Sequence, residues 1–98
     1  MEVRFANADL DRIETDPDFD GGHGVAVVRA FRKVVNIVRN AVDERDLYKM
    51  NSLRFKKLEG SRSHQRSLRL NDQWRLIVEI QSSSPKNVVV VVSIEDYH

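Results

Sequence analysis

The segment from Val88 to Ile94 is a run of apolar residues interrupted only by Ser93. Side chains alternate between the two faces of a strand, so apolar residues at successive positions need cover on both faces. An edge strand cannot provide that cover, and the run is far shorter than the roughly 20 residues that span a bilayer. The segment therefore predicts an interior strand, around which the rest of the fold must be built.

A β-hairpin is predicted immediately before this strand. Its turn contains Asn71 and Asp72, which are typical turn residues. In the first strand, Leu68 shares one face with Leu70 while Arg69 points to the other. In the second strand Arg75 lies opposite an apolar face, which is formed by Trp74, Leu76, Val78 and Ile80. A further strand is expected over residues 52–58, with Leu53, Phe55 and Lys57 on one side.

The first half of the chain predicts a short strand and two helices. Residues 2–5 alternate polar and apolar side chains, as in a half-buried strand. Asn7 is a suitable N-cap for a short helix. A loop rich in glycine and aspartate follows, and then apolar residues recur at three- and four-residue spacing from Val27 to Ala41. We expect this longer helix to end near Asp46.

The order of these elements predicts an α+β fold. A small antiparallel sheet would be covered on one face by two N-terminal helices. We expect residues 1–98 to form a single domain, in which residues 1–46 supply the covering layer and residues 47–98 supply the sheet and the site.

The composition is that of an ordinary soluble globular protein, with 41% hydrophobic and 32% charged residues, and we expect a cytoplasmic location, with which the lack of cysteine is compatible. There is no cysteine, which excludes disulfides and thiolate metal sites. Neither a secretory signal nor a membrane-spanning run is present, so no membrane partner is expected.

The net charge of +1 conceals two oppositely charged segments. Residues 1–22 contain seven acidic and two basic side chains, whereas residues 49–75 contain eight basic and two acidic ones. This asymmetry indicates a surface that faces a polyanion, although an ordinary solvated surface fits the charges equally well.

The basic residues suggest RNA chemistry on the uncovered sheet face. Arg69 and Arg75 fall on that face together, and the loop carrying His64 lies at one end of the hairpin. RNA supplies its own nucleophile, so a nuclease needs a base, an acid and cations for the charged phosphorane. His98 suits the acid or base role, and its α-carboxylate should favour the protonated imidazole.

A structural interpretation of the same residues was open. Arg69 and Arg75 could simply pair with Glu79 or Glu95 across strands. The spacing of His23, His64 and His98 predicts no metal site. There is no glycine-rich phosphate loop and no nucleophile elbow.

The segment LEGSRSHQRSLRLNDQWRLIVEI, followed by IEDYH, resembles the HigB-like branch of the RelE/ParE toxin superfamily. These toxins are the lethal partners of bacterial toxin–antitoxin pairs. The matching motifs are Leu58, Gly60 and Arg62, then Ser67 to Asn71, Gln73 to Leu76, and Asp96 to His98.

The resemblance implies an mRNA endonuclease (mRNA interferase) that acts in the ribosomal A site and uses no metal or other cofactor. It also implies a cognate helix-turn-helix antitoxin, HigA-like, which neutralises the toxin and represses the shared operon. The toxin would then contact operator DNA only through that antitoxin.

The resemblance also assigns roles to residues. Arg75 matches the arginine that stabilises phosphate, Arg69 matches a frequent arginine of the preceding strand, and Tyr97 with His98 matches the pair that performs acid–base or positioning work. The RNA-binding residues would be Lys56, Lys57, Arg62, His64 and Arg66.

Two alternatives remain open. ParE-like relatives poison DNA gyrase by binding it, without cleaving RNA. The chain could also be an inactive binding module that is retained for repression with its antitoxin.

Overall fold

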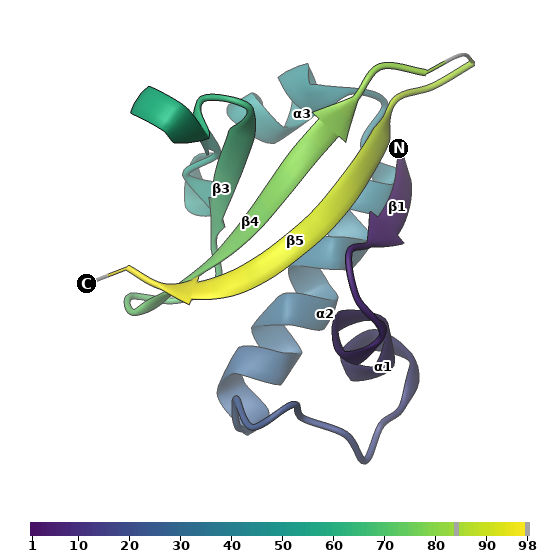
Figure 1. Cartoon of the computed structure of the whole chain (residues 1–98), viewed down its shortest axis with the longest axis vertical. Coiled ribbons are helices and arrows are strands. Elements are labelled where there is room, and N and C mark those ends of the chain that lie inside the picture. Colours follow the sequence, from purple (N-terminus) through teal and green to yellow (C-terminus); the bar gives the residue numbers. More distant parts are fainter. Residues whose placement is uncertain (84, 98) are drawn as a thin grey trace.

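The computed structural model of the chain describes residues 1–83 and 85–97. Within that part of the chain, the strands form one sheet in the order β1-β5-β4-β3-β2 (Figure 1). The strands are β1 (Glu2–Phe5), β2 (Lys56–Lys57), β3 (Gln65–Arg69), β4 (Trp74–Gln81) and β5 (Val88–Asp96).

The prediction of an interior strand is confirmed, because β5 lies between β1 and β4. Strands β2, β3, β4 and β5 are antiparallel neighbours, but β1 runs parallel to β5. The antiparallel strands expected from the second half of the chain are therefore confirmed, whereas the parallel pairing of β1 with β5 was not predicted. A parallel neighbour needs a long crossover connection, and here the helices and the hairpin separate β1 from β5.

Three helices are present in the described residues, where two were expected. They are α1 (Ala8–Thr15), α2 (Val25–Asn40) and α3 (Glu44–Lys49). Asn7 caps α1 as predicted, since its side chain accepts a hydrogen bond from the Leu10 amide. In the part of the chain that the structure describes, no helix has the length and apolar character needed to cross a membrane.

The longer helix does not continue to Asp46. It ends at Asn40, because Ala41 adopts an extended conformation. Asp43 then caps a new helix by accepting a hydrogen bond from the Arg45 amide. A second carboxylate, that of Asp46, accepts a hydrogen bond from the Val42 amide across this break. Two local aspartate caps thus favour a break where the apolar spacing alone predicted continuity.

The strand expected over residues 52–58 is reduced to the two residues of β2. Residues Asn51–Leu53 form a short 3₁₀ helix, η1, and Arg54 then takes a left-handed conformation with φ 46° and ψ 45°. Leu53 and Phe55 are nevertheless both buried, so the apolar positions were identified correctly although the backbone conformation was not.

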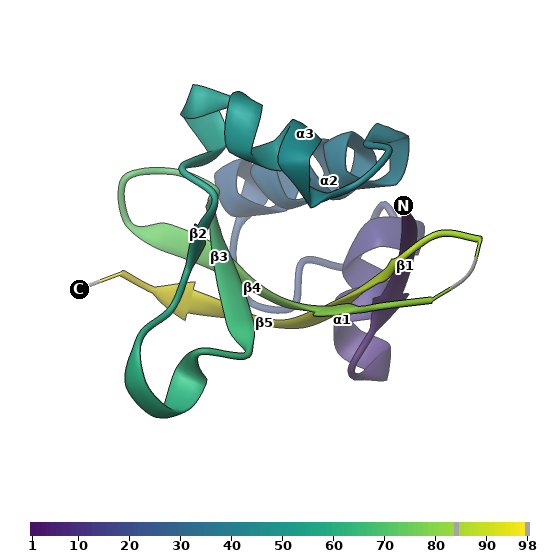
Figure 2. The same ribbon diagram turned by 90° about the horizontal axis from the view of Figure 1, so that it is seen from above.

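The core lies between the helices and one face of the sheet. Figure 2 shows α2 and α3 on the same side of the sheet. The largest fully buried side chains are Ile13 of α1, Phe31, Val35 and Val38 of α2, Leu47 of α3, and Leu68, Leu76, Val78, Val89 and Val91 of the sheet. The opposite face of the sheet carries the candidate site.

Candidate active site

The β3–β4 hairpin places Arg69 directly opposite Arg75 in the strand register. The neighbouring pair, Leu68 and Leu76, is buried in the core, so the two arginines lie on the other face. This placement is the one that the alternation of side chains predicts.

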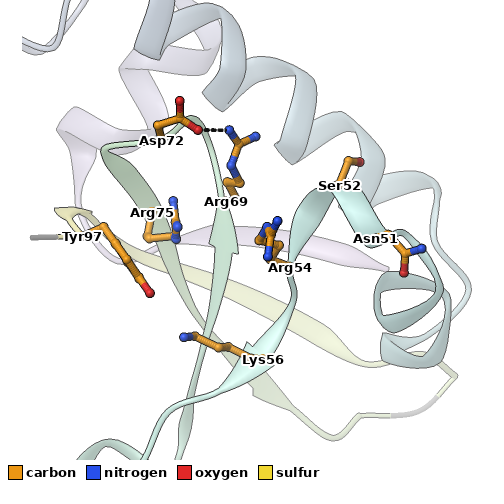
Figure 3. Close-up of a pocket in the computed structure, with 8 residues that line it drawn as sticks. All are labelled: Asn51, Ser52, Arg54, Lys56, Arg69, Asp72, Arg75 and Tyr97. Carbon is orange, nitrogen blue, oxygen red and sulfur yellow. Dashed lines mark hydrogen bonds and ion pairs between the residues drawn. The ribbon is translucent and has the colours of Figure 1, made fainter.

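The arginines line an open hollow of about 660 Å³, which we name the arginine pocket. Its side chains come from the hairpin and Tyr97 on one side, and from the segment around β2 on the other (Figure 3). The lining residues are Asn51, Ser52, Arg54, Lys56, Arg69, Asp72, Arg75 and Tyr97. Four of these carry a positive charge and one carries a negative charge, which suits the pocket to an anion.

Arg75 is held in place by the hairpin turn and by Tyr97. Its guanidinium donates a hydrogen bond to the Asn71 carbonyl at 2.7 Å. The guanidinium carbon also lies 4.0 Å from the centroid of the Tyr97 ring. The Tyr97 amide in turn donates to the Gln73 carbonyl at 2.6 Å. One turn therefore positions both the cation and the ring that contacts it.

Arg69 forms an ion pair with Asp72 at the rim of the pocket. The hydrogen bond from Arg69 lowers the pKa of the Asp72 carboxyl. Asp72 is almost fully exposed and remains ionised at neutral pH. Its carboxylate therefore competes with a phosphate for the guanidinium of Arg69. The predicted alternative, in which Arg69 and Arg75 pair with Glu79 or Glu95, is wrong. Arg69 pairs with Asp72 instead, and Arg75 contacts the Asn71 carbonyl and the Tyr97 ring.

Arg54 and Lys56 complete the positive wall. Arg54 follows η1 in its left-handed conformation, and a non-glycine residue in that region is often found at functional sites. The Lys56 ammonium lies 5.6 Å from the centroid of the Tyr97 ring. Sequence reasoning missed Asn51, Ser52 and Arg54, because a strand was expected where the chain turns.

A second, smaller hollow of about 190 Å³ adjoins the arginine pocket, and we name it the side hollow. The two share Lys56, Arg75 and Tyr97 as a common wall. The other lining residues of the side hollow are Leu58, Arg62, Ser67, Ile77, Glu95 and Asp96.

Comparisons with known proteins address the fold. No protein-family model matches the chain, and no curated protein matches its sequence. Among solved structures, it is similar to a YoeB/ParE toxin from Agrobacterium tumefaciens, at 15% identity and a TM-score of 0.64 over 100% of both chains. It is also similar to YafQ from E. coli strain BL21(DE3), at 9% identity and a TM-score of 0.62 over 98% of this chain and 92% of that one. The chain has the fold of the RelE/ParE-like toxins.

On this toxin fold, the nine residues expected at the site fall into four groups. Arg69, Arg75, Tyr97 and Lys56 line the arginine pocket, and Arg62 lines only the side hollow. His98 lies outside the described residues. The remaining three, Lys57, His64 and Arg66, line neither hollow.

Arg66 and His64 have other surroundings. Arg66 has the same strand parity as the buried Leu68, so it points to the helix side, where its Nε lies 3.7 Å from the Glu44 carboxylate. The His64 imidazole lies 3.8 Å from the carboxylate of Glu79, at the end of β3 away from the arginine pocket. The structure therefore does not bring these two residues to the site.

The charges that line the arginine pocket suit an anion. Within residues 1–83 and 85–97, no group of three or more histidine, aspartate or glutamate side chains is placed to hold a metal ion. Guanidinium groups are permanently charged and match the geometry of phosphate and carboxylate oxygens, so the arginine pocket suits an oxyanion such as a phosphate.

Proposed function

We propose that this protein is the toxin of a bacterial toxin–antitoxin pair and acts as a ribosome-dependent mRNA endonuclease. The observation that carries the proposal is the convergence of Arg69, Arg75, Lys56 and Tyr97 on one open pocket. The likeness in fold to a YoeB/ParE toxin gives independent support.

The proposed reaction uses the 2′-hydroxyl of the message as nucleophile. Its oxygen attacks the adjacent phosphorus as a base removes its proton, and the bond from phosphorus to the 5′-oxygen breaks as an acid protonates the leaving oxygen. The products are a 2′,3′-cyclic phosphate and a 5′-hydroxyl. Arg75 and Arg69 stabilise the charge that develops on the phosphorane oxygens.

Tyr97 orients Arg75 through the ring contact and presents its hydroxyl to the same pocket. We assign the acid or base role to His98 from the family resemblance alone. The ribosome would position the message, and the basic residues around β2 would hold its backbone or ribosomal RNA. Neutralisation would come from a HigA-like helix-turn-helix antitoxin.

The test is inducible expression with primer extension on a reporter message. The wild-type chain should arrest growth and leave messages cut within codons, whereas Arg75→Ala should do neither. Arg45→Ala is the control, because it also removes one arginine but at a position that lines neither hollow. Cleavage that survives both Arg75→Ala and deletion of His98 would contradict the proposal.

Inhibition of DNA gyrase is tested alongside RNA cleavage, because the similar Agrobacterium protein is named for both YoeB and ParE. If the protein poisons DNA gyrase, the purified chain should inhibit supercoiling and leave reporter messages intact. Growth arrest with intact messages and inhibited supercoiling would replace the nuclease proposal with this one.

A further inference from the structure

The side hollow has a floor that is unusual for the uncovered face of a sheet. Ser67 and Ile77 are partners in the β3–β4 register, and both are only 3% exposed although neither faces the helices. Leu58 adds a third, half-buried residue. The hollow therefore has a floor that is apolar at Ile77 and Leu58 and polar at Ser67, under a rim of charged side chains.

The floor contains a polar atom without a partner. The Ser67 hydroxyl oxygen is buried and makes no hydrogen bond to any described residue. Buried hydroxyls are normally hydrogen-bonded, and leaving one unsatisfied is unfavourable. A polar group of a ligand bound in the side hollow, which Ser67 lines, would supply the missing partner once the side chains that cover the hydroxyl shift.

The rim carries an ionised acceptor. Glu95 accepts hydrogen bonds from Arg62 and from the Ser93 hydroxyl, both at 2.8 Å and both to the same carboxylate oxygen. The hydrogen bond from Arg62 lowers the pKa of Glu95, so the carboxylate is charged at neutral pH. It can only accept, and it retains acceptor capacity for hydrogen-bond donors on a ligand.

We propose that the side hollow is a nucleobase subsite, which receives the base next to the phosphate held in the arginine pocket. The inference rests on the proposed function, because the two hollows adjoin and share Lys56, Arg75 and Tyr97 as a common wall. The apolar part of the floor and the Tyr97 ring suit the flat faces of a base. Glu95 selects bases that present amino or imino hydrogens, and guanine, which has both, fits better than uracil.

The first test needs neither a ribosome nor cleavage. The full chain, labelled with ¹⁵N, is titrated with GMP and UMP, which carry the same phosphate and differ in the base. GMP should shift the amide signals of Ser67 and Ile77 and bind about ten-fold more tightly than UMP. In Glu95→Gln the difference between the two nucleotides should largely disappear.

Glu79→Gln is the matched control, since Glu79 lies on the same strand face but lines neither hollow. It should keep the preference for GMP. Equal affinities for the two nucleotides in the wild type, or an unchanged preference in Glu95→Gln, would overturn the inference.

The second test maps cut sites on translated messages in the wild type and in both variants. Glu95→Gln should lose the enrichment of amino-bearing bases beside the scissile bond. If messages are cut with no base enrichment, the subsite is wrong and the nuclease stands. If no message is cut but the preference for GMP depends on Glu95, the nuclease is wrong and the subsite stands.

Discussion

The guanidinium of Arg75 lies against the ring of Tyr97, with 4.0 Å between its carbon and the ring centroid, although Arg75 belongs to β4 and Tyr97 follows β5. The contact holds a flexible side chain in one orientation before any ligand arrives. Pre-organisation of this kind strengthens binding because fewer rotamers are lost when the ligand binds.

This contact predicts different effects for two substitutions of Tyr97. Tyr97→Phe keeps the ring and should bind a short, 2′-O-methylated RNA as the wild type does. Tyr97→Ala releases Arg75 and should weaken that binding about three- to five-fold. Fluorescence titration measures both. Equal affinity in all three proteins would show that the ring does not position the arginine.

The Arg69–Asp72 pair predicts a variant with stronger anion binding. Asp72→Asn removes the carboxylate that competes with phosphate for Arg69, so the affinity for the same RNA should rise about two- to five-fold. The salt dependence should also become steeper, because one more cation is available to the RNA.

Asp43→Asn is the control for this prediction. Asp43 also pairs with an arginine, Arg45, but away from the arginine pocket, and asparagine can replace it as the cap of α3. An equal rise in affinity in Asp43→Asn would attribute the effect to net charge alone.

Arg54 has a left-handed backbone conformation, so two substitutions at this position should differ in stability but not in RNA binding. Arg54→Gly removes the steric cost of this conformation, so it should unfold in urea with a free energy about 1 kcal/mol higher than Arg54→Ala. Both variants lose the same charge from the arginine pocket and should bind RNA equally weakly. A glycine variant no more stable than the alanine variant would contradict the assignment of strain.

The pair between Arg62 and Glu95 predicts a pH dependence of stability. The pKa of Glu95 is lowered in the folded chain by the hydrogen bond from Arg62, so in acid the unfolded chain binds the extra proton first. The contribution of Glu95 is therefore present at neutral pH and is lost as the pH falls below about 4. The difference in unfolding free energy between the wild type and Glu95→Gln, measured in urea, should be present at pH 7 and should shrink as the pH falls into the acid range.

Local rules predicted the centre of the candidate site. The alternation of side chains and the short turn at Asn71 and Asp72 fix the register of the hairpin, and that register places Arg69 beside Arg75. The parity of Arg66 with Leu68 also indicates that Arg66 points to the helix side. That signal is present in the sequence, although the resemblance places Arg66 among the expected RNA-binding residues.

Other parts of the site depend on tertiary structure. Arg54 reaches the arginine pocket only because η1 packs Leu53 into the core and the chain then reverses through a left-handed residue. No local pattern favours arginine in that conformation. The parallel pairing of β1 also lay beyond local rules, because it depends on contacts between the two ends of the described chain.

The position of β1 beside β5 has a consequence for the order of assembly. Strands β3, β4 and β5 follow one another in sequence and pair with their neighbours, so their contacts close short loops. By contrast, β1 must find its partner across nearly the whole chain, which is the slow kind of contact to form. The hairpin and Tyr97 can thus come together while the edge beside β5 is still unoccupied. We expect the backbone amides of β1 to exchange hydrogen with solvent at a lower opening free energy than those of β4. The sheet should therefore open first at the edge remote from the arginine pocket.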